Sequence, residues 1–535
     1  MKRRRFLAQC VAAGAGSFLA ERGFASAATE LTEFGTAGSG TANTAAELTL
    51  EEQLAGSTTG PWRRLILDGA VIEAQQGLQR FFYSAQKLDG NPLIRADKAW
   101  EGTSAIIGPY CYGTVMYQDG MFRLWYQVLF QGNHVGYAES DDGIHWRKPA
   151  LDIIAYKGVQ TNFVVSAFDP AACGGGYCHN PSVIQRPEEQ DSAKRFALYA
   201  YDTEKKAPRV AFSPDGLHWN YHQEREDKGL FSSSDVVNFF FDPYQQKYFA
   251  TWKSRNRRGR AVGVATSKDG IDWHKPYDGP VFSADDNDPS DTQIYGMPVF
   301  PYQGLYLGMP WIYRAEYFRY GEYSVAKLHE AQESSPRTMY PQLAWSWDMI
   351  QWTRPQDRKP LIELGERGSW DAGMIVTARA PVVVGDKLYF YYGGCDKVHD
   401  EKQVKAGIGL AVLRQDGFCS MKSDEEGWLL TRREPMLEPR VVINARVETG
   451  GQIQAELLDR KNRVVPGFSR EESEPFMGDS TSFELRWKTA TFEGKAKHKD
   501  YKIRFWLNKA ELFSYLPSKL DPQEPDIARF QSTGP

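Results

Sequence analysis

The sequence predicts an all-β protein, a five-bladed β-propeller followed by a small β-sandwich. Three observations predict this class. A turn motif with the spacing Ser-x-Asp-x3-Trp occurs four times, each time after a strand-like run. Hairpins that read strand, turn, strand precede these motifs in the same order. Aromatic residues make up 13% of the chain, a share that suits a β-rich fold better than a helical one.

The four copies of the motif lie at 139–149, 211–219, 265–276 and 344–355. Their tryptophans, Trp146, Trp219, Trp273 and Trp352, are 73, 54 and 79 residues apart. That spacing leaves room for about four strands with loops, as in a propeller blade, and exceeds the periods of helical solenoids. A fifth unit at 407–418 keeps the strand and the Asp-Gly turn without the tryptophan.

Within each copy we expect the Asp-Gly pair to supply the positive-φ positions of a tight turn. The tryptophan then covers the end of a small sheet. The four aspartates are Asp142, Asp215, Asp269 and Asp348. They are therefore interpreted as structural rather than catalytic.

The two ends of the chain differ from the repeats. Residues 1–28 have a basic start, a weakly apolar middle and an Ala-x-Ala site, which predict an export signal. The pair within Arg3, Arg4 and Arg5 favours the twin-arginine type, with an ordinary secretory signal as the alternative. We expect a periplasmic or secreted protein with a flexible lead-in at 29–60, the propeller at 61–434, the sandwich at 435–517 and a tail at 518–535.

Composition limits the partners and cofactors. The net charge of −4 gives no support for nucleic-acid binding, and no later apolar stretch is long enough to span a membrane. After residue 28 the cysteines are scattered and show no zinc spacing. Cys173 and Cys178 could form a small disulfide or stay as two thiols. No organic cofactor is expected.

Functional residues are expected where the innermost strands begin, because those strand starts converge at one mouth of a propeller channel. The residues before the hairpins include Tyr110, Cys111, Tyr112, His179, Asn180, Asp235, Asn238, Asp288, Asp291, Gln293, Tyr295, Trp370 and Asp371. Carboxyl groups, a histidine, amides and aromatic rings suit glycosidic chemistry. One carboxyl protonates the leaving oxygen, another acts as base or nucleophile, and rings stack on sugar faces.

The chain resembles the five-bladed propeller glycosidases, the group of invertases, levanases, arabinanases and xylosidases, over about residues 90–434. The resemblance rests on 108–127 (GPYCYGTVMYQDGMFRLWYQ), 239–252, 368–374 and the repeated turns. It is greatest to an uncharacterised bacterial branch similar to the family 32 N-terminal domain. The trailing sandwich also fits the invertase-like members.

The family's catalytic positions do not carry over. Where those enzymes place an aspartate before the first blade, this chain has Gly108, Pro109 and Tyr110. The Arg-Asp-Pro and Glu-Cys signatures are missing as well. If the chain is an enzyme, its acids lie on other blades.

Asp235, Asp291 and Asp371 are the catalytic candidates, and each could instead cap a turn. Serines beside Asp235 could keep it ionised by hydrogen bonding, and the acidic run around Asp291 could raise one pKa into the general-acid range. The substrate-binding candidates are His179, Asn180, Asn238, Tyr295, Glu316, Trp370 and His399, of which His179, Glu316 and His399 are also second choices for catalysis.

Two charged runs have further interpretations. The run of Asp285, Asp286, Asp288 and Asp291 could bind a structural calcium ion, although its spacing is not that of an EF-hand. The arginines of 253–260, KSRNRRGR, could bind a sulfate, phosphate or uronate, or form a solvated turn.

The sequence thus predicts a secreted glycoside hydrolase that acts on a polysaccharide or oligosaccharide. A non-catalytic carbohydrate-binding or scaffold propeller and a phosphate-using glycoside phosphorylase are the alternatives.

Overall fold

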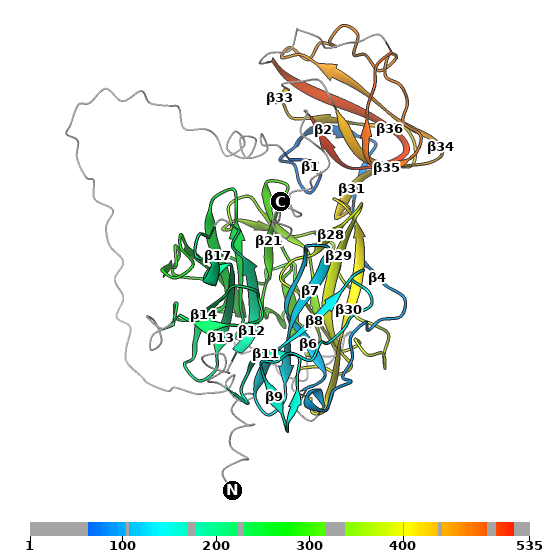
Figure 1. Ribbon diagram of the computed structural model, residues 1–535. Helices are drawn as coiled ribbons and strands as arrows, with labels where there is room; N and C mark the ends of the chain where they lie inside the picture. Colours follow the sequence, from blue (N-terminus) through cyan, green and yellow to red (C-terminus); the bar gives the residue numbers. More distant parts are fainter. Residues whose placement is uncertain are drawn as a thin grey trace, which may run out of the picture. The chain divides into compact units, whose positions relative to one another are not determined.

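A computed structural model describes residues 62–102, 106–169, 178–187, 189–222, 229–315, 337–399, 401–436, 441–488 and 499–517 (Figure 1). The helical elements in these ranges are two short 3-10 turns, Ala99–Glu101 and Ser192–Lys194, and none of them could span a membrane. The predicted all-β class is confirmed. The export signal, lead-in and tail, together with Cys173 and Glu316, lie outside the described residues.

Four antiparallel sheets of four strands follow one another and give a propeller-like arrangement. The first two sheets are β6 (Pro109–Gln118), β7 (Met121–Leu129), β8 (Asn133–Ser140) and β11 (Phe163–Ser166), then β12 (Cys178–Gln185), β13 (Phe196–Asp202), β14 (Ala207–Ser213) and β15 (Asn220–Tyr221). The next two are β16 (Val237–Asp242), β17 (Lys247–Asn256), β18 (Gly259–Ser267) and β19 (Trp273–His274), then β21 (Val299–Tyr302), β22 (Leu305–Gly308), β25 (Ala344–Ser346) and β26 (Trp352–Thr353). The small pair β9 (Ala155–Tyr156) and β10 (Val159–Gln160) stands apart.

A nine-stranded sheet contains the strands of the expected fifth unit. Its path is β20 (Thr292–Ile294), β23 (Trp311–Arg314), β24 (Met339–Pro341), β27 (Met374–Thr377), β29 (Lys387–Cys395), β30 (Val404–Arg414) and β4 (Gln86–Lys87), with β28 (Val382–Val384) on β29 and β5 (Ile106–Ile107) on β30. Thus β28, β29, β30 and β4 pair in succession, but β27 joins them to a larger sheet. The described residues form four separate blades, and the count of five stays a prediction.

The repeated turns share one hydrogen-bonding scheme. In the first copy, Asp142 Oδ1 accepts the backbone N–H groups of Ile144 and His145 at 2.8 Å each, and Ser140 Oγ accepts that of Gly143 at 2.9 Å. The other three copies repeat these bonds. The expectation that the aspartate also has positive φ is wrong. Only the residue after the aspartate has positive φ, with values of 76°, 80° and 81° at the glycines and 68° at Met349. The aspartate stabilises the turn through the hydrogen bonds of its side chain.

Aromatic side chains of one sheet donate hydrogen bonds to backbone carbonyls in the repeated turn of another sheet. Trp125 Nε1 donates to the carbonyl of Gly216 at 2.7 Å, and Tyr199 Oη donates to that of Gly270 at 3.1 Å. Tyr391 of β29, late in the chain, donates to Gly143 in the first repeat at 2.8 Å. This last bond links the two ends of the repeat series and closes the ring.

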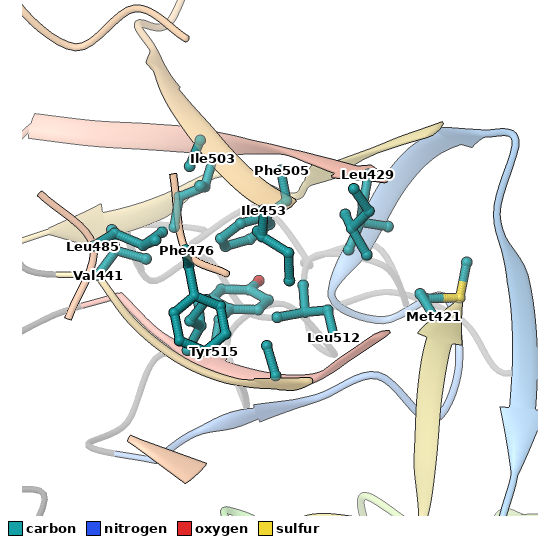
Figure 2. Packing of buried hydrophobic residues seen from close by; sticks show 14 of the residues in the cluster. Met421, Leu429, Val441, Ile453, Phe476, Leu485, Ile503, Phe505, Leu512 and Tyr515 are labelled. Carbon is teal, nitrogen blue, oxygen red and sulfur yellow. The ribbon is translucent and has the colours of Figure 1, made fainter. Parts of the chain in front are cut away.

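The C-terminal strands form a second nine-stranded sheet. Its members are β31 (Cys419–Ser423), β32 (Gly427–Thr431), β33 (Glu434–Met436), β34 (Val442–Leu458), β35 (Asp479–Glu484) and β36 (Lys499–Leu516), with β1 (Arg64–Leu65), β2 (Ile72–Gln76) and β3 (Gln79–Phe82). The buried side chains of Leu429, Ile453, Phe476, Phe505 and Tyr515 pack at its core (Figure 2). Early strands therefore complete this late sheet, and the domain boundaries given above stay predictions.

Candidate active site

The starts of the inner strands bring a set of rings and charges together, which we call the tyrosine cluster. Its members are Tyr110, Tyr112, His179, Asp235, Lys253, Arg260, Tyr295, Trp311, Tyr313 and His399. Tyr112 lies at its centre. The centroid of the Tyr112 ring is 4.6 Å from that of Tyr110, 5.3 Å from that of His179 and 5.2 Å from that of Trp311. The residues come from five separate stretches of chain.

Asp235 forms the charged part of the cluster. Its Oδ1 lies 2.5 Å from Lys253 Nζ, and Ser234 Oγ donates to the same oxygen at 3.0 Å. The backbone places this pair, because the N–H of Lys253 in β17 donates to the carbonyl of Val236 at 3.0 Å. The Asp235 side chain is 41% exposed, whereas that of Lys253 is 9% exposed. A substrate could therefore reach the carboxylate while the ammonium group stays behind it.

The electrostatics favour an ionised Asp235. Burial opposes ionisation, but the Lys253 ammonium, His179 and the Ser234 hydrogen bond together hold the pKa of Asp235 well below its usual range. Burial lowers the pKa of Lys253, against the opposing effect of Asp235. Burial also lowers the pKa of His179, so its imidazole is neutral at pH 7. Asp235 is thus ionised, which suits a nucleophile better than a general base, and with Lys253 in place it is not an acid.

Tyr295 connects the charged pair to the other cations. Lys253 Nζ lies 4.2 Å from its ring centroid, and the Arg260 guanidinium lies 5.5 Å from it and 5.0 Å from that of Tyr313. Its hydroxyl is 3.0 Å from His399 Nε2. Three predicted binding residues, His179, Tyr295 and His399, therefore lie in one cluster.

Asn180 and Asn238 stand just behind the cluster, where they join β12 to β16. Both are buried. Asn180 has φ of 55°, its N–H donates to Gln127 Oε1 at 2.8 Å, and its Nδ2 donates to the carbonyl of Val237 at 3.0 Å. This geometry indicates a positioning role, in which the amides hold the strand that carries Asp235.

Asp291 lies in a different environment. Its side chain is 2% exposed, and both oxygens accept Arg314 Nε at 3.0 Å, with Arg314 Nη2 2.8 Å from Oδ1. A two-pronged contact of this kind neutralises the charge and fixes the carboxylate. The contacts of Asp291 are therefore those of a buried, ion-paired carboxylate.

Asp371 is also separate. Its side chain is 3% exposed and lies 2.5 Å from Lys87 Nζ, and it accepts hydrogen bonds from Tyr392 Oη and Ser369 Oγ at 3.0 Å each. Trp370 stacks on Tyr392 at 5.5 Å. This network links β4 to β29 across the intervening strand β30, so the contacts of Asp371 and Trp370 are those of structural residues.

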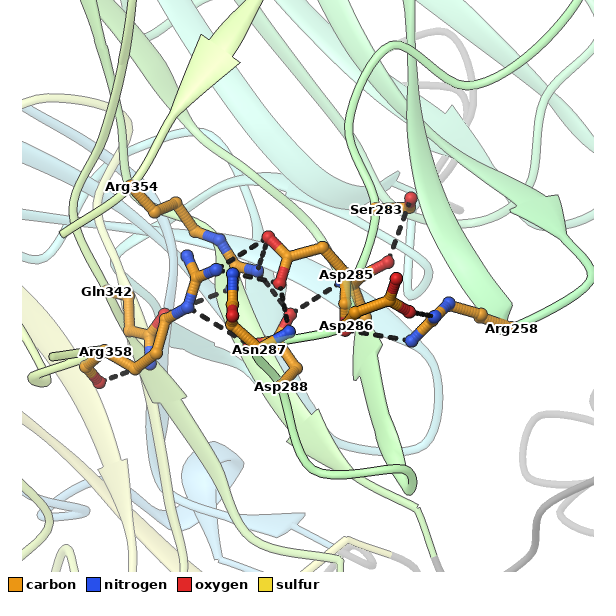
Figure 3. A network of polar contacts seen from close by, with 10 residues as sticks. Arg258, Ser283, Asp285, Asp286, Asn287, Asp288, Gln342, Arg354 and Arg358 are labelled. Atoms are coloured by element: carbon orange, nitrogen blue, oxygen red, sulfur yellow. Dashed lines mark hydrogen bonds and ion pairs between the residues drawn. The ribbon is translucent and has the colours of Figure 1, made fainter. Parts of the chain in front are cut away.

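The acidic run at 285–288 faces arginines (Figure 3). Arg354 pairs with Asp285 and Asp288, Arg358 lies 2.6 Å from Asp285, and Arg258 pairs with Asp286. Although burial opposes it, the Asn287 N–H and these guanidinium groups lower the pKa of Asp285. Asp285 is therefore not a member of the run whose pKa is raised. Within the described ranges no group of three or more His, Cys, Asp or Glu side chains is arranged to hold a metal ion, so the calcium ion stays a prediction.

Sequence reasoning missed Lys253 and Tyr313. The sequence signal for Lys253 was its position. It ends the aromatic run KYFATWK in β17, next to the start of β16. Arg260 belongs to the cluster as well, whereas the sequence indicates only that it is part of the arginine run at 253–260.

No family model matches the chain, and no curated protein matches it by sequence. A glycosyl hydrolase from Bacteroides ovatus is similar in structure, with a TM-score of 0.43 and 16% identity over 62% of this chain and 94% of that one.

Two further solved structures are similar. One, described under the GH130 family of mannoside phosphorylases and glycoside hydrolases that target β-1,2 mannosidic linkages in Candida mannan, has a TM-score of 0.43 and 17% identity over 62% of this chain and 94% of that one. A fructofuranosidase from Schwanniomyces occidentalis has a TM-score of 0.36 and 11% identity over 81% of this chain and 98% of that one. At these values the likeness assigns no activity to this chain.

Proposed function

We propose that the chain is a glycoside hydrolase that cleaves a polysaccharide or oligosaccharide at the tyrosine cluster, with Asp235 as the reacting carboxylate. The observation that carries this proposal is the environment of Asp235. Of the three candidate aspartates, it alone has an accessible side chain and lies among several aromatic rings. An ionised carboxylate beside rings that can stack on a sugar is suited to nucleophilic attack on an anomeric carbon.

Hydrolysis needs a second carboxyl group to protonate the leaving oxygen. Among the described residues, no candidate aspartate other than Asp235 joins the cluster. Glu316 follows Ala315, which packs in this cluster and donates its N–H to the carbonyl of Asp291 at 2.9 Å. Glu316, a second choice for catalysis on sequence grounds, lies outside the described residues, and we propose it as the acid.

One observation favours phosphorolysis as a second candidate. The described part of the cluster pairs a single candidate carboxylate with Lys253, Arg260 and two histidines. Phosphate is already a nucleophile, so its oxygen can attack the anomeric carbon without a base. If phosphate drew Lys253 away, the pKa of Asp235 would rise, and Asp235 could then give its proton to the leaving oxygen.

The test is sugar release by the chain from residue 29 onward, measured against polysaccharides and aryl glycosides with and without inorganic phosphate. Release without phosphate supports hydrolysis. Release of a sugar phosphate that needs phosphate supports the second candidate. Glycan binding with no cleavage in either condition would contradict both and support a binding propeller.

We also propose export by the twin-arginine route, on the basis of residues 1–28. The test replaces Arg4 and Arg5 by lysine and follows the protein by cell fractionation. Retention in the cytoplasm supports the proposal, and unchanged export contradicts it.

A further inference from the structure

Arg379 is a buried arginine that has no acidic partner among the residues that the structure describes. Five arginines among the described residues are at least nine-tenths buried. Four pair with acids, namely Arg63 with Asp416, Arg64 with Glu434, Arg209 with Asp202 and Arg354 with Asp288. Arg379, 9% exposed, pairs with no acid in the described part of the chain, and its Nε has no hydrogen-bond partner there.

Its place in the fold is next to the tyrosine cluster. The N–H of Arg379 donates to the carbonyl of Gly113 at 2.9 Å, and Gly113 directly follows Tyr112 in β6. Two residues earlier, Thr377 Oγ1 accepts Trp311 Nε1 at 3.2 Å, and Trp311 stacks on Tyr112. The backbone of Arg379 therefore lies one step along β6 from the centre of the cluster.

The guanidinium remains a cation in this position. Burial lowers the pKa of Arg379 to about 10, which still leaves the group protonated at pH 7. A buried charge without a counter-charge is strongly unfavourable, so such a group is normally compensated. The described part of the chain offers no carboxylate here, so a bound oxyanion would supply the missing counter-charge.

We propose that Arg379 binds an oxyanion beside the tyrosine cluster. The planar guanidinium presents paired N–H donors that match two oxygens of a carboxylate, sulfate or phosphate. Two sources share this chemistry: a free inorganic oxyanion, and the carboxylate of an acidic sugar. The first is independent of the proposed function, whereas the second rests on it and would make the substrate a uronate-containing glycan.

The test is the melting temperature of the full chain at constant ionic strength in sulfate, phosphate, galacturonate and, as a neutral control, galactose. Sulfate stabilises proteins in general, so the measured quantity is the difference between wild type and Arg379→Met. We expect wild type to gain about 3 °C at a hundredfold excess over Kd, and Arg379→Met to gain only the general effect. Arg258→Met, which removes an arginine paired with Asp286, should behave like wild type.

The four additives distinguish a free anion from a sugar acid as the ligand. A specific shift with sulfate or phosphate identifies a free anion, and a shift with galacturonate alone identifies a sugar acid; either supports the site even if no glycan is cleaved. Equal responses of wild type and Arg379→Met to every anion would overturn it.

Should Arg379→Met fail to fold, wild-type crystals grown with selenate decide the matter. Anomalous density within about 3 Å of the guanidinium supports the site, and its absence, with no galacturonate shift in wild type, overturns it.

Discussion

Asp235 Oδ1 and Lys253 Nζ lie 2.5 Å apart, and only the carboxylate of the pair is open to solvent. This asymmetry gives the carboxylate a fixed charge and a reachable face. The ion pair thus links the fold, which places β16 against β17, to the chemistry proposed for the cluster.

Replacing Lys253 by methionine should raise the pKa of Asp235, because the main cation that lowers it is removed. The acid limb of the pH–rate profile should move to higher pH. Since Asp235 is partly exposed, the free energy of unfolding should fall by only about 1 kcal/mol. Arg147→Met, which breaks an exposed pair with Asp141, is the matched control and should change neither quantity. An unmoved acid limb in Lys253→Met would contradict the pairing.

The stability contributed by Asp235 should depend on pH in one direction. Its pKa is lower in the folded state than in the unfolded chain, so its contribution is complete above the unfolded value of about 3.9 and is lost as pH falls through the folded value. Wild type and Asp235→Asn should therefore differ by a constant unfolding free energy from pH 5 to 8 and converge below about pH 4. Urea titrations at each pH measure this. A gap that widens on acidification would show the opposite sign of coupling.

Gly270→Ala should destabilise the contact between the second and third four-stranded sheets. Gly270 has φ of 81°, and a Cβ there would lie 2.2 Å from Tyr199 Oη. We expect a loss of about 2 to 4 kcal/mol in urea unfolding. Gly279→Ala, where no atom lies within 4 Å of the added Cβ, should be close to neutral. Equal effects of the two changes would mean that the turn contact is unimportant.

Asp416→Ala should lower stability without affecting sugar release. This aspartate is 1% exposed and accepts Tyr302 Oη at 2.5 Å and Ser514 Oγ at 2.6 Å. Removing it leaves two buried hydroxyls without their acceptor, which should cost about 3 kcal/mol. Asp424→Ala, at an exposed position whose distance to Lys422 is 3.9 Å, serves as the control. A wild-type melting temperature for Asp416→Ala would be inconsistent with this network.

Much of the fold was predictable because its signal is periodic. The four turns repeat the same Ser and Asp hydrogen bonds, so Ser140 and Asp142 could be recognised from spacing alone. The contribution of β1 to β3 to a sheet made of late strands was not predictable, since strand partners distant in sequence leave no local pattern.

The residues near the site could be predicted from the sequence, but the cation that pairs with each aspartate could not. Strand starts located His179, Asp235 and Tyr295 together. The same rule selected Asp291 and Asp371, which the fold neutralises with Arg314 and Lys87. Such cations come from distant strands, so the environment that separates a working carboxylate from a structural one is visible only in three dimensions.

The most direct test of the central claim is kcat/KM for Asp235→Asn on the substrate found in the glycan screen. Asp291→Asn and Asp371→Asn are measured beside it, all at matched folded fraction. The account predicts a loss of at least about a hundredfold for Asp235→Asn and less than about tenfold for the two buried aspartates. Near wild-type activity in Asp235→Asn, with a large loss in either of the others, would contradict it and move the reacting carboxylate away from the tyrosine cluster.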